Sequence, residues 1–197
     1  MAEELPELLV PDADAWRAWL AANHATSPGV LLVLTKKGGT VTALGIDDAI
    51  DQALCFGWVD GRIGRRDDAS YLTRFTPRRA KSRWSKLNVD RVERLTAEGL
   101  MAPAGEAAVA AAQASGLWEA AYAGQASVTV PQDLLDAVRA QPEAQAMFDV
   151  LTSANRYALI YRLDAAASPQ ARERKLAEFV AMLARHETPH PQHRMPS

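Results

Sequence analysis

Two features that this sequence lacks limit the classes of protein to which it can belong. It has a single cysteine, Cys55, which excludes an internal disulfide and fits a reducing compartment. No apolar run approaches the roughly 20 residues that a membrane helix needs. The first ten residues carry acids where a signal peptide needs Lys or Arg. We therefore expect a cytoplasmic protein with no membrane span.

Several catalytic signatures are also missing. Gly57, Gly61 and Gly64 do not form a dinucleotide fingerprint between a strand and a helix, and there is no Gly-x-Ser-x-Gly elbow. His186–His190 places two histidines around a glutamate, as zinc proteases do. Pro189 disrupts the helical turn that would align both imidazoles, so the sequence predicts no metal and no cofactor.

The charge that is present is unevenly distributed. At 197 residues, with 48% hydrophobic and 23% charged residues, the chain fits one domain or two small ones. From Arg62 to Arg94 there are eleven Lys or Arg and four Asp or Glu, and these eleven are half of the 22 basic residues. The formal net charge of −2 therefore hides one concentrated positive segment, which predicts an anionic partner.

The first half of the chain mixes strand-like and helical patterns. Val59, Gly61 and Ile63 alternate with polar and glycine positions, which predicts a strand with one apolar face. Pro77 has no amide hydrogen to donate and should end the following strand, while Asn88 is a candidate helix cap. The patterns predict a helix, a buried strand, a helix, two hairpin strands and a surface helix over 12–23, 29–36, 47–56, 58–65, 71–76 and 89–98.

The second half reads as helix. After the alanine-rich stretch that follows Pro103, further helices are predicted to start near Pro131, Pro142, Ser153 and Pro169. The predicted fold class is α+β: a small antiparallel sheet with packed helices in residues 1–100, and a helical part over 101–186 packed on it. Residues 187–197, with three prolines in a polar run, are predicted to be disordered.

The sequence resembles the bacterial YdeI/OmpD-associated family, also called the bacteriocin-protection family, from Trp16 to Arg174. The resemblance implies protection against bacteriocins or envelope stress, and it carries over no catalytic residues. The family commonly has a lysine and then a Thr-Arg pair where this chain has Ala167 and Ala171-Arg172. The segments that carry the resemblance are Ala53–Gly61, Phe75–Arg79, Ser82–Asn88, Val92–Leu95, Gly99–Gly105 and Pro131–Val138.

Four residues of the positive segment suggest an anion pocket. Asp60 would orient the guanidinium groups of Arg74, Arg78 and Arg79, whose remaining donors would bind a phosphate or carboxylate. The alternative is a structural ion-pair cluster that holds the hairpin to the following loop. Both interpretations remain open at this stage.

Further candidates flank the arginines. Ser82, Ser85 and Asn88 are spaced three apart and would share one face of a helical turn, unless each only caps or bonds locally. Trp58 and Trp84 could stack on a ligand, or could belong to the core. The candidate ligand-binding residues are therefore Trp58, Asp60, Arg74, Arg78, Arg79, Ser82, Trp84 and Asn88.

Three functions follow from these patterns. The first is a non-catalytic cytoplasmic protein of the stress or bacteriocin-protection type that binds an anionic small molecule or protein partner. The second is an enzyme on a phosphorylated or carboxylated substrate, with Asp60 as acid or base. The third is nucleic-acid binding, favoured by aromatic residues among the arginines but opposed by a pI of about 6.1. Cys55 is interpreted as a buried hydrophobe, and a homodimer is left open.

Overall fold

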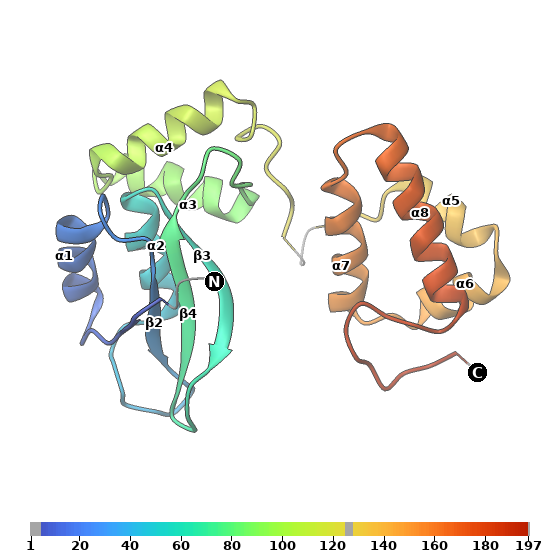
Figure 1. Ribbon diagram of the computed structural model, residues 1–197, viewed down its shortest axis with the longest axis horizontal. Coiled ribbons are helices and arrows are strands. Elements are labelled where there is room, and N and C mark those ends of the chain that lie inside the picture. Colours follow the sequence, from blue (N-terminus) through green and yellow to red (C-terminus); the bar gives the residue numbers. More distant parts are fainter. Residues whose placement is uncertain (1–4, 125–127, 197) are drawn as a thin grey trace. The chain divides into compact units, whose positions relative to one another are not determined.

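The computed structural model describes residues 5–124 and 128–196. The chain forms two compact units, Met1–Ala121 (unit 1) and Tyr122–Ser197 (unit 2). Each unit has its own hydrophobic core. The predicted α+β class is confirmed, with a sheet near the N-terminus and helices alone in the C-terminal part (Figure 1).

Unit 1 contains a four-stranded sheet with the strand order β1-β2-β4-β3. The predicted hairpin is present, because β3 and β4 pair antiparallel. Sequence reasoning missed β1, a two-residue strand too short to show an alternating pattern. It pairs parallel with β2, so the sheet is mixed. The strands are β1 (Glu7–Leu8), β2 (Val30–Thr35), β3 (Trp58–Arg65) and β4 (Ser70–Pro77).

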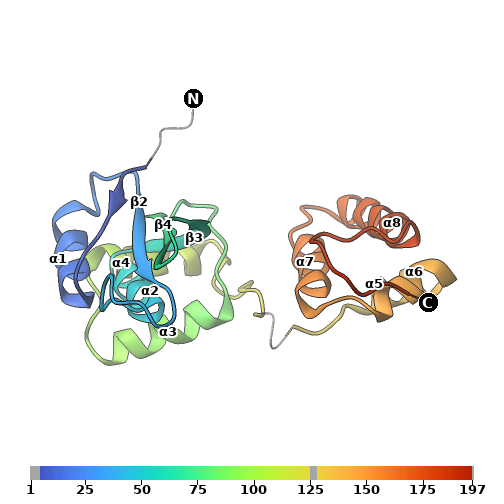
Figure 2. The same ribbon diagram turned by 90° about the horizontal axis from the view of Figure 1, so that it is seen from below.

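Helices gather on one face of this sheet (Figures 1 and 2). Alternate residues of β2, Val30, Leu32 and Leu34, face them together with Phe75 of β4, and all four are buried. Trp16 of α1 joins the same core, and its indole Nε1 donates to the Ala49 carbonyl at 3.0 Å. The helices are α1 (Ala13–Asn23), α2 (Ile46–Cys55), α3 (Lys86–Ala97) and α4 (Pro103–Ala114).

Strand β3 is buried at its start and mostly exposed from Gly61 onward. Trp58 is 1% exposed, whereas Ile63, expected on the apolar face, is 63% exposed. Ile63 lies opposite Thr73 and Trp58 lies opposite Pro77, so both side chains are on the face of the sheet that carries Phe75. The register shift between Asp60 and Ile63 adds one residue to β3, which breaks the predicted alternation, and Ile63 lies in the exposed part of the strand.

Helix α3 begins three residues before the predicted start. Ser85 caps it, and the Ser85 hydroxyl oxygen accepts from the Asn88 amide at 3.1 Å. Asn88, predicted as the cap, therefore lies inside the first turn. A hydroxyl three residues upstream of an amide is an alternative cap that periodicity alone cannot rank.

Helices α2 and α4 approach each other closely. Gly57 ends the α2 segment as predicted, with φ of 73°. At Gly105 of α4 an added Cβ would lie 2.2 Å from the Cys55 carbonyl oxygen. That carbonyl also accepts a hydrogen bond from the Ala102 amide at 3.0 Å. The start of α4 thus belongs to unit 1, although the sequence boundary at residue 100 assigned it to the helical part.

The described residues of unit 2 form four helices around a second core that includes Leu134, Met147, Leu159 and Phe179. Thr152 and Ser168 supply side-chain caps for the last two helices. No helix among the described residues has the length and apolarity needed to cross a membrane. The helices are α5 (Gln132–Arg139), α6 (Pro142–Asp149), α7 (Ser153–Asp164) and α8 (Pro169–Ala184).

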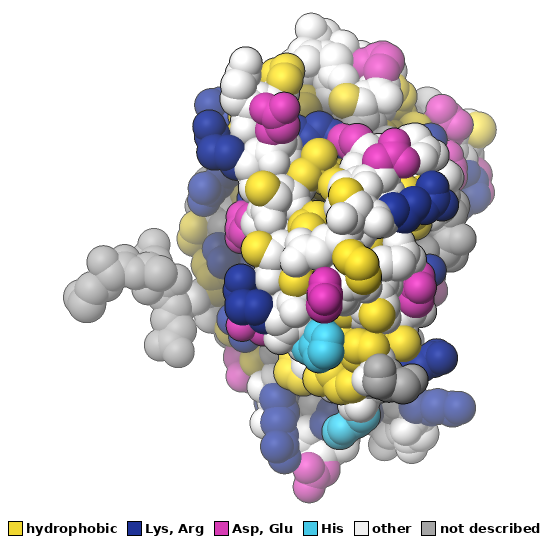
Figure 3. Space-filling model, turned by 90° about the vertical axis from the view of Figure 1, so that its right-hand side faces the viewer, with side chains coloured by type: hydrophobic (Ala, Val, Ile, Leu, Met, Phe, Trp, Pro, Cys, Tyr) yellow, Lys and Arg dark blue, Asp and Glu magenta, His cyan; other side chains and the backbone are white. Residues whose placement is uncertain are grey.

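The segment after α8 folds back on α7. The buried side chain of Asn155 bonds to the backbone of His190 in the segment for which we predicted disorder. Figure 3 shows hydrophobic side chains gathered beside histidines, below a surface on which charges of both signs alternate. His186 lies beyond the end of α8 in a left-handed conformation, with φ of 57°, so His186 and His190 do not share a helical turn.

Candidate functional site

A small hollow lies between the loop after β4 and helix α4. Its volume is about 90 Å³. The loop supplies the polar side, and the small side chains of α4 leave the space open on the other side. The lining residues are Arg78, Arg79, Ala80, Ser82, Trp84, Ala108, Ala111, Ala112 and Leu117.

Backbone hydrogen bonds fix the loop that carries the arginines. The Arg78 amide donates to the Gly57 carbonyl at 2.9 Å, which ties the end of β4 to the end of α2. The Arg79 amide donates to the Ser82 hydroxyl oxygen at 2.9 Å, and the Ser82 amide donates back to the Arg79 carbonyl at 2.8 Å. This reciprocal pair closes a tight turn and holds Arg79 and Ser82 beside the hollow.

Arg78 is held by an aromatic ring. Its guanidinium carbon lies 3.5 Å from the centroid of the Trp84 ring, and its Nη1 donates to the Arg83 carbonyl at 3.2 Å. Trp84 is itself 3% exposed and meets Trp118 edge to face, with ring centroids 4.9 Å apart. The cation-π contact therefore fixes the orientation of Arg78, and Trp84 is a buried wall of the site.

Arg79 carries the accessible charge at this hollow. Its side chain is exposed, and it forms no ion pair with any carboxylate in the described ranges 5–124 and 128–196. The Ser82 hydroxyl oxygen accepts from the Arg79 amide, so its own hydrogen is available to donate. The lining residues include no carboxylate, histidine or cysteine. The polar groups that line the hollow are therefore hydrogen-bond donors, two guanidinium groups and one hydroxyl.

The structure does not bring Asp60 to Arg74. Asp60 lies opposite Phe75 in the ladder, so these two side chains share a face of the sheet. Arg74, the neighbour of Phe75 along β4, points to the other face and is exposed. Within the part of the chain that the structure describes, Asp60 forms no ion pair. The predicted role of Asp60 in orienting guanidinium groups has no geometric basis here.

Two other candidates, Trp58 and Asn88, contribute to the fold and do not line the hollow. Trp58 is in the core, and its indole Nε1 donates to the His24 carbonyl at 3.2 Å. Asn88 lies in the first turn of α3, where its amide is capped by Ser85. Because Ser85 is the cap, Ser82 lies outside the helix and the three polar residues do not share one turn. Of the eight predicted residues, the hollow brings together Arg78, Arg79, Ser82 and Trp84.

Sequence reasoning missed the wall supplied by α4. Ala108, Ala111 and Ala112 line the hollow with Leu117 just after the helix. The alanine-rich stretch indicated close packing, but no local pattern showed that its partner would be the 78–84 loop. That information lies in the tertiary fold.

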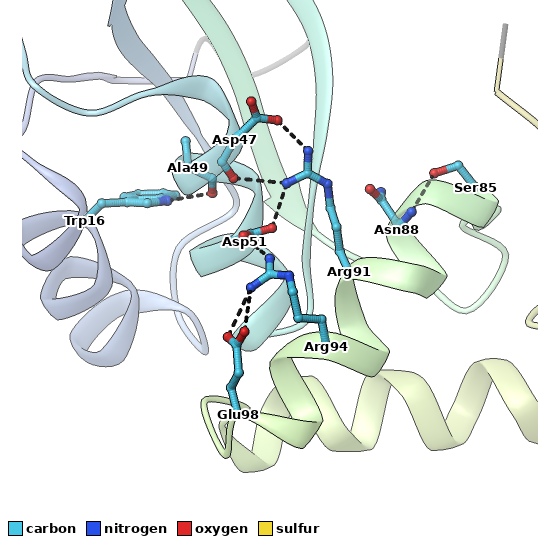
Figure 4. Close-up of polar contacts among 9 residues, drawn as sticks. All are labelled: Trp16, Asp47, Ala49, Asp51, Ser85, Asn88, Arg91, Arg94 and Glu98. Carbon is cyan, nitrogen blue, oxygen red and sulfur yellow. Dashed lines mark hydrogen bonds and ion pairs between the residues drawn. The ribbon is translucent and has the colours of Figure 1, made fainter. Parts of the chain in front are cut away.

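Part of the positive segment is neutralised by an ion-pair network between α2 and α3 (Figure 4). Arg91 binds Asp47 and also Asp51, the latter at 2.7 Å, while Arg94 binds Asp51 and Glu98. Burial by itself would lower the pKa of the Arg91 guanidinium. Its hydrogen bonds to Asp51 and Asp47 outweigh burial and raise the pKa above its ordinary value. Arg91 and Arg94 therefore link α3 to α2.

At the turn between β3 and β4, two more of the eleven basic residues form ion pairs. Arg65 lies 3.6 Å from Asp68, and Arg66 lies 2.9 Å from both Glu7 and Asp67. These ion pairs and the α2–α3 network use arginines other than Arg74, Arg78 and Arg79, for which the structural ion-pair alternative was predicted. The basic residues that pair with no carboxylate in the described residues include Arg62, Arg74, Arg79, Lys81 and Lys86.

Cys55 behaves as the sequence interpretation expects. Its side chain is fully buried at the end of α2. Burial raises the pKa of the Cys55 thiol above its ordinary value, against the opposing effect of Arg17. A buried, protonated thiol is a poor nucleophile.

Comparison with known proteins matches the N-terminal and C-terminal parts of the chain to two different families, roughly as the structure divides it into units 1 and 2. Residues 127–186 match the family described as Bacteriocin-protection, YdeI or OmpD-Associated. The resemblance to that family is therefore confirmed for the C-terminal part, and not from Trp16 onward as expected. No curated protein and no solved structure matches the chain. Residues 8–108, just over half of the chain, match another family, and the protein thus belongs to the family described as Domain of unknown function (DUF8412).

Proposed function

We propose that the hollow beside the 78–84 loop binds the anionic end of a small molecule or of a protein partner, without catalysing a reaction. The observation that carries the proposal is a cavity whose charged and hydroxyl-bearing walls come from Arg78, Arg79 and Ser82, with no carboxylate among the lining residues. A guanidinium and a hydroxyl both donate to carboxylate or phosphate oxygens.

The size of the hollow limits what can enter. Small-molecule sites usually measure about 300–1,000 Å³, and this one measures about 90 Å³. Since a water molecule takes about 30 Å³ of the liquid, the space suits one carboxylate or phosphate group. The remainder of the ligand would lie outside, beside the exposed Arg79 and Lys81.

Pre-organisation also supports binding. Arg78 is already oriented by Trp84, and the Arg79–Ser82 turn is closed by two hydrogen bonds. An anion would meet donors whose positions are largely fixed, which reduces the entropy lost on binding. Because Arg79 is exposed, the affinity should fall as salt concentration rises.

The two alternatives have less support. An enzyme would need an acid or base, and Asp60 does not line the hollow. Binding of single-stranded nucleic acid would need exposed aromatic rings for stacking, yet among the aromatic residues interleaved with the arginines Phe75 and Trp84 are buried and Tyr71 is partly buried. The family description matched by residues 127–186 motivates bacteriocin protection or envelope stress as the physiological setting of the proposed binding, with the protein in the cytoplasm.

A thermal-shift screen tests this function. Wild-type protein is screened at low salt against phosphorylated and carboxylated metabolites, beside Arg79→Gln and the matched variant Arg62→Gln, which changes an exposed arginine of β3 outside the hollow. A ligand at 100 times its Kd stabilises the folded state by about 2.7 kcal/mol. We expect compounds that raise the Tm of wild type and Arg62→Gln but not of Arg79→Gln. Equal loss in both variants, or no stabilising compound, would refute the proposal.

A further inference from the structure

Helix α7 in unit 2 carries apolar residues on two faces. Leu159, Ile160 and Leu163 are buried in the core of the unit. A second set is spaced three and four residues apart, which places its members on one side of a helix, and all of them keep exposed surface. This second set is Ala154, Tyr157, Ala158 and Tyr161.

A hollow of about 310 Å³ lies over this second face, within the usual size range of small-molecule sites. Its lining consists of the four residues of that face together with Arg162 and His190. Ala154 and Ala158 have small side chains, which leave space over this face of α7 beside the tyrosines. The tyrosine rings contact one another. Tyr161 meets Tyr122 edge to face, with ring centroids 5.0 Å apart, and the ring centroids of Tyr161 and Tyr157 are 6.0 Å apart.

A buried amide of α7 holds in place the lining residue that comes from the segment after α8. Asn155 is fully buried, and its Oδ1 accepts from the His190 amide at 2.8 Å. Its Nδ2 donates to the His190 carbonyl at 3.0 Å and to Gln192 Oε1 at 2.8 Å. A buried amide that satisfies both its donor and its acceptor on the backbone of one residue specifies where that residue lies. The position of His190 at the hollow is therefore built into the fold of unit 2.

The charge at this hollow is positive. Arg162 is exposed and has no ion-pair partner within residues 5–124 and 128–196. The lining contains no Asp or Glu. A guanidinium beside aromatic rings presents a planar fork to a carboxylate and a stacking surface to a planar ring.

We propose that this hollow binds a small planar aromatic molecule that bears one carboxylate. Its ring lies against Tyr157 and Tyr161, between the two alanines, and its carboxylate pairs with Arg162. The site is independent of the anion hollow in unit 1, because the lining residues of the two hollows belong to different units.

Titration of isotope-labelled protein with naphthoate, followed through backbone amide signals in NMR spectra, tests the site. We expect saturable shifts confined to amides of residues 154–162 and of His190. Naphthamide lacks the charge and cyclohexanecarboxylate lacks the aromatic ring. Each should bind about tenfold more weakly, since each removes one of the two contacts. Absence of saturation, or equal affinity for all three compounds, would overturn the proposal.

Three substitutions locate the binding. Arg162→Gln should raise the Kd for naphthoate about tenfold, whereas Arg174→Gln, at an exposed arginine of α8 outside the hollow, should leave the Kd unchanged. Ala158→Leu keeps a good helix former but places a larger side chain in the hollow, and should abolish the shifts while the circular dichroism spectrum is retained. If Ala158→Leu binds as well as wild type, the hollow is not the binding site.

Discussion

Arg78 is the residue at which folding and proposed binding are hardest to separate. Its backbone amide joins β4 to the end of α2, its guanidinium lies over Trp84, and its Nη1 reaches the Arg83 carbonyl. Arg79, next in the chain, has an exposed side chain. The two arginines line the same hollow, yet only one of them should matter to stability.

Alanine substitution separates the two roles. Arg78→Ala should lower the free energy of unfolding by about 1–2 kcal/mol, because a close cation-π contact and a hydrogen bond are lost. Arg79→Ala should leave the unfolding free energy within about 0.5 kcal/mol of wild type. Urea denaturation followed by tryptophan fluorescence measures both values. Equal destabilisation by the two variants would contradict the assigned roles.

Cys55 gives a second prediction at this scale. Because burial raises the pKa of its thiol, the folded state keeps the proton to higher pH than the unfolded state does. The resulting stabilisation is complete below the ordinary thiol pKa of 9.0 and is lost as pH rises above it. A thiol reagent should react slowly with native protein at mildly alkaline pH and rapidly after unfolding in urea. Since Cys55 is the only cysteine, the absorbance signal reports this residue alone, and fast native reaction would refute its burial.

At the scale of elements, the approach of α4 to α2 positions the hollow. Gly105 lets the two helices meet at the Cys55 carbonyl, where a Cβ would come within 2.2 Å. The same approach brings the alanines of α4 to the 78–84 loop. Gly105 thus sets the distance between α2 and α4 and, with it, the geometry of the hollow beside the 78–84 loop.

Gly105→Ala tests this packing. Alanine improves helix propensity by about 1 kcal/mol, but crowding against backbone in a packed core costs about 1–3 kcal/mol or more. With no room at 2.2 Å, we expect the crowding to prevail and the Tm to fall. Gly124→Ala is the control, since a Cβ there meets nothing within 4 Å. A Gly105→Ala variant as stable as wild type would show that the helices can move apart without cost.

Sequence reasoning worked best for whole elements and worst for their ends and faces. The hairpin and the helices were predictable because each has its own periodicity. The cap of α3 was misplaced because Ser85 and Asn88 are both good caps, and the side of β3 on which Ile63 lies was misassigned because a pattern of period two does not reveal the extra residue between Asp60 and Ile63. Asp60 and Arg74 could be separated only once the β3–β4 register was known.

At the scale of the whole molecule, the two cores predict two folding units. The residues of the first core lie within 8–121, and those of the second within 128–184. The sequence boundary at residue 100 would remove Ala112 and Trp118 from the first core. Four of the nine residues that line the proposed anion site would also be removed.

Fragments of the chain test this division. Residues 1–121 should fold alone and unfold cooperatively on heating, because they contain a complete core. Residues 1–100 should be markedly less stable, because α2 loses the helix that packs on it. Circular dichroism during thermal unfolding distinguishes the two fragments. Equal stability would place the unit boundary at the earlier position.

The most direct test of the anion site is a titration with inorganic phosphate, followed through the backbone amide signals of isotope-labelled protein. Ala111→Leu fills the hollow from α4, and Ala110→Leu adds the same side chain at an exposed position outside the lining. We predict saturable shifts at Arg79–Ser82 in wild type and Ala110→Leu, and none in Ala111→Leu. Shifts spread over Arg62, Lys86 and other surface cations, unaffected by Ala111→Leu, would contradict the proposal that the hollow binds anions.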